Sequence, residues 1–223
     1  MHAVCRALSR KALMMRGMPP PTLLVRRAAF SIDDPWGVPP SCEVVPLRRA
    51  TDGAPPRLQT NVIVFADDEC LNVLFQSQDD GVVATHLRHD APLYEEDVFE
   101  VFLSPAELTR YYEIEVNPLG TTFDARIDSP EGTRANMHAH LGWECANLFA
   151  AVRKTPEAID TILRIPFASL DRRRPAAGEQ WRGNFFRVDR SAAHGDEFSA
   201  WQPTMKTPAD FHVTAAFGRI VFA

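Results

Sequence analysis

The feature that most constrains the fold is a series of short segments in which apolar and polar residues alternate. Pro, Gly, Asp or Asn interrupts the pattern every ten or so residues from about residue 42 onward. The alternation is plain in residues 71–77, 97–103, 111–117, 159–165 and 216–222. Period-two patterning bounded by turn residues is typical of half-buried antiparallel strands. Many such strands at close spacing predict an all-β fold, a single antiparallel β-sandwich of the jelly-roll or immunoglobulin-like kind.

Helical signals are weak, and composition adds a few exclusions. Ser104 and Pro105 predict one short helical turn, with the serine as its cap. The chain has 223 residues, of which 45% are hydrophobic, so it can bury a core without a metal or disulfide staple. The cysteines include no CxxC pair, which excludes a zinc ribbon or a thioredoxin-like site. A disulfide between Cys42 and Cys70 stays open.

Charge is distributed unevenly along the chain. Residues 1–30 carry six basic residues and no acidic one, which leaves 18 basic and 29 acidic residues, a net charge of −11, to residues 31–223. We therefore expect a disordered or mis-started basic tail over 1–30 and one domain over 31–223. The apolar runs in the tail are too short for a secretory signal, although its arginine-rich character is also found in transit peptides. No run approaches the ~18 apolar residues of a membrane span, and an acidic body disfavours nucleic acid as a partner.

One face of the predicted sheet is unusually polar. If Phe99, Val101 and Leu103 point into the core, Glu100 lies on the opposite face of its strand. The same reasoning places Glu113, Glu115 and Asn117 on that face of the next strand, and Asp124 and Arg126 on that face of the following one. Planar acceptors and donors beside aromatic rings suit a sugar, because hydroxyls need hydrogen-bond partners and the pyranose C–H face packs on a ring. A plain solvent-facing sheet gives the same pattern.

Several motifs occur in an order that resembles a known family. They are LYEEDVFEVFLSP (93–105), YYEIEVNPLGTTFDA (111–125), the Ile-Pro-Phe step (165–167), RGNFFRVDR (182–190), FSAWQPT (198–204) and a terminal Phe-Gly (217–218). Together they resemble the family 9 carbohydrate-binding module and its stand-alone relatives, within the DOMON-like group of β-sandwiches. The resemblance covers residues 31–223.

The resemblance implies non-catalytic binding of a glycan end, notably a reducing end, between two aromatic rings. It also implies a link to polysaccharide or carbohydrate catabolism and a place outside the cytoplasm. By motif position the rings are Tyr94 and Trp201, and the polar partners are Glu100, Asn117, Asn184 and Arg126. The chain departs from the family in two places: Tyr94 stands where a tryptophan is common, and no glutamate precedes the Ile-Pro-Phe step.

Each of these residues also has a plain structural interpretation. Trp201 suits a core position, Tyr94 an ordinary loop, Glu100 a salt bridge with Arg187 or Arg126, and Asn117 the turn that follows it. Binding requires no cofactor, but the resemblance implies structural calcium. Acidic loops offer oxygen ligands for it at Asp67, Asp68, Glu69, Asp79 and Asp80, with solvated turns as the alternative.

Two other functional classes stay open. A glycoside hydrolase needs two nearby carboxylates, which Glu100, Glu113 and Glu115 could supply. A haem-binding DOMON-like cytochrome domain needs axial Met or His ligands. The candidates for those ligands are Met137, His138, His140, Met205 and His212. Nucleophilic and nucleotide-binding motifs such as GxSxG, the P-loop and GxGxxG are absent from the sequence.

Overall fold

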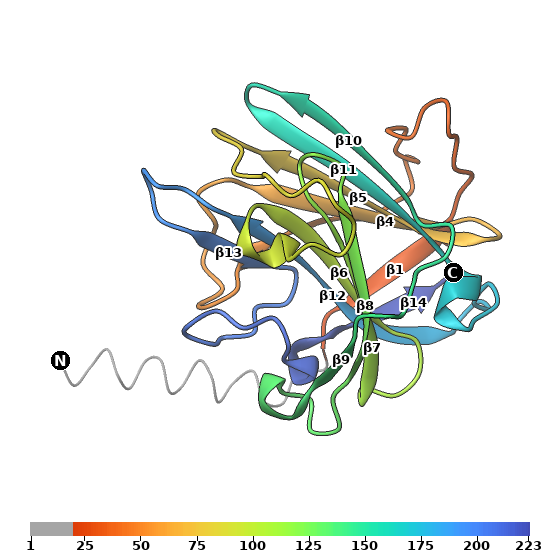
Figure 1. Cartoon of the computed structure of the whole chain (residues 1–223). Coiled ribbons are helices and arrows are strands. Elements are labelled where there is room, and N and C mark those ends of the chain that lie inside the picture. Colours follow the sequence, from red (N-terminus) through yellow and green to blue (C-terminus); the bar gives the residue numbers. More distant parts are fainter. Residues whose placement is uncertain (1–19) are drawn as a thin grey trace.

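The computed structural model describes residues 20–223, and the disorder expected for residues 1–19 lies outside them (Figure 1). The described chain is all-β, as predicted, with short 3₁₀ helices and no α-helix. The strands are β1 (Thr22–Arg27), β2 (Val44–Pro46), β3 (Arg48–Arg49), β4 (Thr60–Ala66), β5 (Cys70–Gln78), β6 (Val98–Ser104), β7 (Arg110–Val116), β8 (Thr122–Asp128), β9 (His138–His140), β10 (Phe149–Thr155), β11 (Ala158–Pro166), β12 (Gln180–Asp189), β13 (Glu197–Ala200) and β14 (Gly218–Phe222). The 3₁₀ helices are η1 (Leu93–Glu95), η2 (Arg134–Asn136), η3 (Phe167–Leu170) and η4 (Thr214–Ala216).

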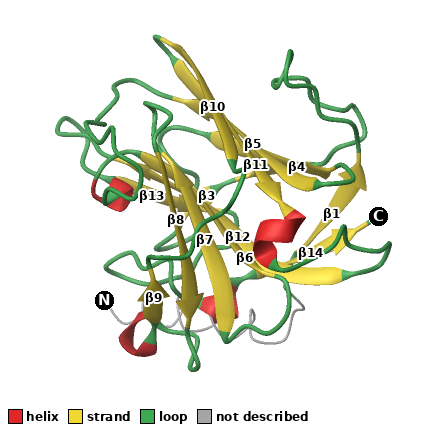
Figure 2. Cartoon of the chain, turned by 45° about the vertical axis from the view of Figure 1, so that its right-hand side comes forward, coloured by secondary structure: helices red, strands yellow, loops and turns green. Residues whose placement is uncertain are grey.

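The strands form two layers (Figures 1 and 2). The first layer has the order β10-β11-β5-β4, with β2 paired to β4. The second has the order β14-β12-β6-β7-β8-β9, with β13 paired to both β12 and β3. Strand β1 joins the layers, because Thr22–Val25 pair in parallel with β14 while Arg26 and Arg27 pair in parallel with β4. One continuous path of strands is thereby folded over into a sandwich.

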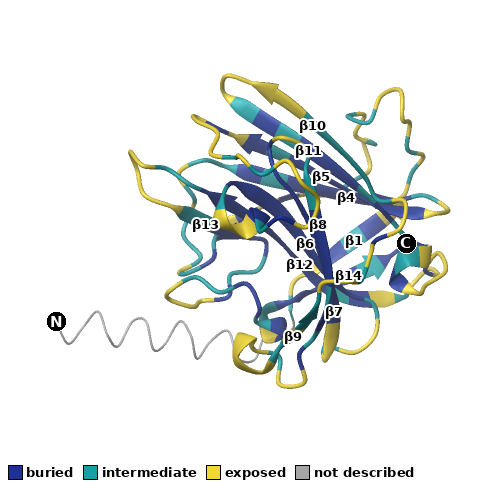
Figure 3. Ribbon diagram, in the orientation of Figure 1, coloured by how far each residue is buried: buried dark blue, intermediate teal, exposed yellow. Residues whose placement is uncertain are grey.

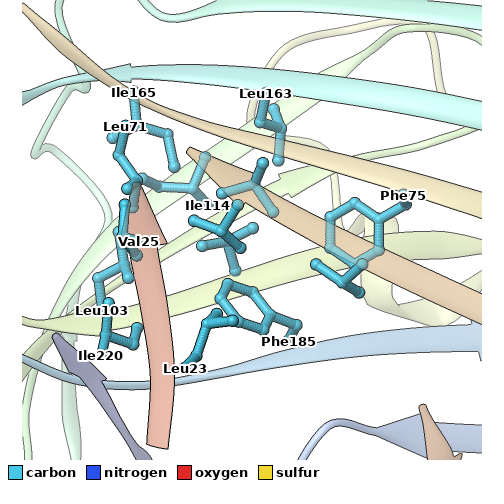
Figure 4. Close-up of a cluster of buried hydrophobic side chains, with 14 of the residues drawn as sticks. Leu23, Val25, Leu71, Phe75, Leu103, Ile114, Leu163, Ile165, Phe185 and Ile220 are labelled. Carbon is cyan, nitrogen blue, oxygen red and sulfur yellow. The ribbon is translucent and has the colours of Figure 1, made fainter. Parts of the chain in front are cut away.

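The main core lies between the two layers (Figure 4). Leu71 and Phe75 of β5 and Leu163 of β11 face Leu103 of β6 and Ile114 of β7. All five side chains are almost fully buried. The alternation in the sequence predicts these inward positions correctly, since period two places every second side chain on the same face of a strand.

The first strand corrects the predicted domain boundary. Leu23 and Val25 of β1 are buried in the main core, so the sandwich begins before residue 31 and includes part of the segment that was predicted to be a tail. The short run TLLVRR is weak as a sequence signal because only two of its side chains reach the core. Its role comes from backbone pairing with β4 and β14, which are distant in the sequence.

A second apolar cluster covers the outer face of the β6-β7-β8-β12 layer. It includes Phe102, Tyr111, Phe123, Phe186 and Phe217. Figure 3 shows much of β6 and β12 in the colour of buried residues. This layer is therefore buried on both faces, which differs from the solvent-facing alternative.

Two local features complete the fold. The predicted helical turn after Ser104 is wrong. The Ser104 hydroxyl lies 2.8 Å from the carbonyl oxygens of both Glu107 and Arg110, which share its one hydrogen, within an irregular β6–β7 connection. No helix in residues 20–223 is long and apolar enough to cross a membrane.

Candidate functional site

A pocket of about 510 Å³ opens on the outer face of the second layer. Its floor comes from β6, β7, β8 and β12, and its walls come from the loops that cover this face. The lining residues are Asp90, Pro92, Tyr94, Glu100, Glu113, Phe123, Arg134, Met137, Ala139, Leu141, Val188, Phe198, Ala209, Phe211 and His212. The pocket therefore combines aromatic rings with a few charged groups, as ligand sites commonly do.

Strand register brings three glutamates together at the floor. Glu100 of β6 is paired with Glu115 of β7, and Glu113 of β7 is paired with Phe102 of β6. Directly paired residues lie on the same face of a sheet, so the three side chains share the pocket face. At least one carboxylate oxygen of each lies within 4.8 Å of the others. The prediction that Glu100, Glu113 and Glu115 share one face is confirmed.

The carboxyl groups lie in a strongly desolvated environment. Glu100, Glu113 and Glu115 are all buried, and the oxygens of Glu115 meet no basic or amide donor, only the carboxyl group of Glu113. Burial raises the pKa of Glu113 to about 7. Burial, together with the charge of neighbouring glutamates, raises the pKa values of Glu100 and Glu115 well above the usual carboxyl range. Burial also lowers the pKa of His212 to about 3, so this wall residue is neutral at physiological pH.

Two groups of aromatic rings line the pocket. The Tyr94 ring is 49% exposed and meets the Phe123 ring edge-on at 6.2 Å between centroids. In the second group, Phe211 stacks on Phe186 at 4.1 Å and meets Phe198 edge-on at 6.1 Å between centroids. Tyr94 therefore offers an accessible ring, while the other rings are buried or partly buried and pack against one another.

Arginines fix the loops that carry these rings. Arg190, which follows β12, donates from Nη2 to the carbonyl of Tyr94 at 2.8 Å. Its guanidinium also lies 5.2 Å from the Phe198 ring centroid, a cation–π contact. Arg134 of η2 lines the pocket and donates from Nε to Asp210 at 3.0 Å. Two of the pocket walls are thereby anchored to the sandwich.

Of the six residues nominated from the sequence, Tyr94 and Glu100 line this pocket. Trp201 does not, because it is 7% exposed and belongs to the main core. Its ring lies flat over Gly218, where an added Cβ would come within 2.4 Å of the indole, and packs 5.5 Å from the Phe185 ring. The structure thus places Trp201 where the plain structural interpretation expects it, and not opposite Tyr94.

The two nominated asparagines are fully buried and bonded to backbone. Asn117 accepts hydrogen bonds from the amides of Leu119 and Thr121 and donates to the carbonyl of His86. Asn184 accepts from the Phe185 and Gln202 amides and donates to the Gln202 carbonyl. Asn117 therefore shapes the β7–β8 turn and Asn184 fastens the loop after β13, and neither lines the pocket.

The predicted placement of Asp124 and Arg126 on the polar face is wrong. In the observed register Arg126 is paired with Tyr112, and Asp124 is paired with Ile114. Both side chains therefore share the inter-layer face of the sheet, while Phe123 and Ala125 lie on the pocket face. The cause is the second apolar cluster, which takes the apolar side chains of β8 on the face where polar ones were expected.

The acidic loops that suggested calcium are paired with arginines. Asp67 is paired with Arg164, Asp68 with Arg27 and Arg174, Asp79 with Arg187, and Asp80 with Arg57. Asp67 also accepts the amides of Glu69 and Cys70. Guanidinium and amide donors thus already contact carboxylate oxygens that a cation in these loops would need, while Glu69 is exposed, with Arg164 at 3.7 Å.

The candidate haem ligands are scattered. Met137 and His212 line the pocket, but Nδ1 of His212 shares a hydrogen bond of 2.5 Å with the Tyr111 hydroxyl. His140 of β9 shares a hydrogen bond of 2.7 Å with Asp128, His138 is exposed, and Met205 is exposed in an irregular segment. Among residues 20–223, the structure does not bring two of these candidate side chains together on opposite sides of a cavity, as two axial haem ligands would need to be.

Sequence reasoning missed several wall residues, chiefly Phe198, Phe211 and Arg134, and considered His212 only as a haem ligand. They lie on loops and edge segments without periodicity, so no local pattern assigns them to a site. Phe123 was detectable as the aromatic residue of its strand but was assigned to the wrong face.

The architecture and this pocket define the class of protein. It is a β-sandwich with an aromatic-lined, acid-floored pocket on the outer face of one layer. The chain matches the model of carbohydrate-binding family 9 over residues 53–222, and it belongs to that family. A curated relative from Arthroderma benhamiae, described as an extracellular protein, is 27% identical over 203 residues, which span 84% of this chain and 87% of the relative.

Solved structures share the fold at low sequence identity. A provisionally assigned carbohydrate-binding protein from Bacteroides uniformis has a TM-score of 0.72 at 18% identity, covering 92% of this chain and 100% of that one. A family 9 carbohydrate-binding module from Caldicellulosiruptor kristjanssonii in complex with cellotriose has a TM-score of 0.62 at 14% identity, covering 90% and 93%. The same kind of module in complex with glucose has a TM-score of 0.63 at 14% identity, covering 91% and 95%.

Proposed function

We propose that the chain binds the end of a carbohydrate in the pocket beside Tyr94, without chemical conversion. The observation that carries this proposal is the pocket itself, which is lined by an accessible ring and by buried carboxyl groups. Family membership supports it, because the family is one of carbohydrate-binding modules. The complexes of structural neighbours with cellotriose and glucose direct the first choice of ligand to glucose-type sugars.

Each part of the pocket has a role in this mechanism. The C–H face of a pyranose packs on the Tyr94 ring, while sugar hydroxyls donate to Glu100 and Glu113. Arg134 supplies a donor from the wall. Protein hydrogen bonds replace those that the sugar makes with water, so the net gain in binding free energy is small. We therefore expect a dissociation constant in the micromolar to millimolar range. With Trp201 in the core, the second surface for the sugar is the wall that holds Phe198 and Phe211.

The arrangement of carboxyl groups favours binding over hydrolysis. Glycosidases place two carboxyl groups on either side of the scissile bond, about 5–9.5 Å apart. Here one oxygen from each of the three glutamates lies within 4.8 Å of the others, and all three side chains stand on the same face of neighbouring strands. This arrangement supports binding, because it forms one acidic cluster and not a pair of separated groups.

The test is a calorimetric titration of the full chain with glucose, cellotriose and other soluble oligosaccharides, each paired with its borohydride-reduced form. We expect saturable binding that weakens on reduction if the bound end is the reducing one. Loss of the Tyr94 ring removes a contact worth about 1 kcal/mol, so Tyr94→Ala should weaken binding about fivefold.

Tyr94→Phe is the matched control, because it keeps the ring and removes only the hydroxyl. It should bind nearly as well as the wild type. Binding that is indifferent to Tyr94→Ala would overturn the assignment of this pocket, and wild-type protein that binds none of the sugars would overturn the proposed function.

A further inference from the structure

The three glutamates at the pocket floor lack the compensation that buried charges normally have. Carboxylates buried in a protein are paired, hydrogen-bonded or bound to a metal. Glu115 is completely buried, and its oxygens accept no hydrogen bond from a backbone amide, a hydroxyl or a basic side chain. Its side-chain hydrogen-bond contact is with Glu113, which is another carboxyl group. This unsatisfied side chain points to a missing partner at the floor.

A second acidic cluster in the same chain shows what compensation looks like. Asp79, Asp97 and Asp189 also bring carboxylate oxygens within 4.8 Å of one another. Arg187, itself buried, donates to Asp79 at 2.7 Å and to Asp189 at 2.8 Å. Asp97 accepts two backbone amides, from Val83 and Arg190. That cluster is satisfied by the protein alone.

Nothing equivalent reaches the glutamates within the described part of the chain. The ion-pair contact that these glutamates make is with His212, whose Nε2 lies 4.0 Å from Oε1 of Glu113. Arg134 lines the same pocket, but its ion pair is with Asp210, at 3.0 Å. Among residues 20–223, no basic side chain or backbone amide therefore compensates Glu115, whose side-chain contact is with the carboxyl group of Glu113.

The geometry fits a small, hard cation. Ca²⁺ binds carboxylate oxygens at 2.3–2.6 Å, so two ligands of one ion lie at most about 5 Å apart. The oxygens of Glu100, Glu113 and Glu115 meet this limit. The set contains oxygen ligands alone, which suits calcium better than zinc or copper. Glu115 lies behind the pocket lining, so an ion can reach it more readily than a substituent of a sugar ring.

We propose that Glu100, Glu113 and Glu115 hold one divalent cation of the calcium class at the floor of the pocket. The ion leaves coordination positions open toward the pocket, where sugar hydroxyls bind to it. The contact between the ion and a sugar rests on the proposed function, whereas the cation site itself does not.

The first experiment measures the cation without any sugar. The full chain is stripped with a chelator, dialysed and titrated with Ca²⁺ by calorimetry. We expect the wild type to bind Ca²⁺, and Glu115→Gln, which keeps the shape and removes the charge, to weaken that binding at least tenfold. Glu157→Gln, on the exposed β10–β11 turn, is the matched control and should bind like the wild type.

Absence of binding at millimolar Ca²⁺ would overturn the cation site, as would unchanged affinity in Glu115→Gln. Glu113→Gln provides a second variant should Glu115→Gln fail to fold, and it should show the same loss. Preserved affinity in a folded Glu113→Gln protein would count against the site.

The second experiment repeats the sugar titration with Ca²⁺ and with chelator. We expect sugar affinity to fall at least tenfold when Ca²⁺ is removed, and equal affinity in both conditions would overturn the role of the ion in ligand contact. Protein that binds Ca²⁺ through Glu115 but no sugar would overturn the proposed function and leave the cation site standing.

Discussion

At the scale of single residues, the two nominated aromatic rings have different environments. Tyr94 is half exposed at the pocket, whereas Trp201 is buried over Gly218 and against Phe185. Both stand at positions that the family resemblance assigned to ring platforms. Their exposure distinguishes their roles, because only an accessible ring can pack against a ligand.

Trp201→Ala should therefore act on stability. Removing a large side chain from a packed core typically costs about 3–5 kcal/mol of unfolding free energy, because a cavity remains. The measurement is urea unfolding followed by circular dichroism.

Trp36→Ala is a suitable control. Trp36 is only partly buried outside the first layer, where Arg153 lies 4.7 Å from its ring centroid, and its loss should cost clearly less. A Trp201→Ala protein with wild-type stability and weakened sugar binding would contradict the core placement.

At the scale of elements, the loop before β6 is tied to β12 through one carboxyl group. Asp97 accepts the amides of Val83 at 2.6 Å and Arg190 at 2.7 Å. Burial raises its pKa to about 6, above the ordinary value near 4. Because the folded state holds this proton more tightly than the unfolded state, stability falls as pH rises from about 4 to about 6, and this contribution is flat above that range.

Asp97→Asn should remove that part of the pH dependence. The slope of unfolding free energy between pH 4 and pH 6 should become more positive than in the wild type, whatever the change in absolute stability from the altered hydrogen bonds. Denaturant unfolding at several pH values measures it, with the exposed Asp33→Asn as control. An unchanged slope would show that Asp97 does not titrate as described.

The sequence predicts the strands well but assigns their faces unevenly. Alternation places Leu71, Ile114 and Leu163 in the main core correctly, because the first layer and the inner face of the second meet there. It fails on β8, where Phe123 and Ala125 face the second apolar cluster and Arg126 faces inward. Where loops bury the outer face too, polarity no longer tells the two faces apart.

The candidate site shows the same limit. Tyr94 and Glu100 were found through motifs around a strand, and both line the pocket. Asn117 and Asn184 have equally regular motifs, yet their polar atoms serve the backbone. The loop residues Arg134 and Phe211 carry no pattern, since tertiary structure alone brings them to the floor strands.

At the scale of the whole molecule, the two layers depend on β1 for their connection. Its first four residues pair with β14 and its last two pair with β4. A chain that begins at residue 31 loses this strand and leaves the facing edges of β4 and β14 without it. Exposed strand edges promote association between chains.

We therefore expect residues 31–223 to melt at a lower temperature than residues 20–223 and to aggregate more readily. Differential scanning calorimetry and size-exclusion chromatography on the two fragments measure this. Equal melting temperatures would show that β1 is dispensable and that the domain boundary predicted from the sequence is adequate.

The most direct test of the central claim is to locate the bound sugar on the molecule. Assigned amide and aromatic NMR signals of the full chain are followed during titration with cellotriose. We predict that the perturbed signals cluster around Tyr94, Phe123, Arg134 and Phe211, while signals of the β10-β11-β5-β4 layer stay unchanged. Perturbations centred on that layer, with the pocket unaffected, would contradict the account.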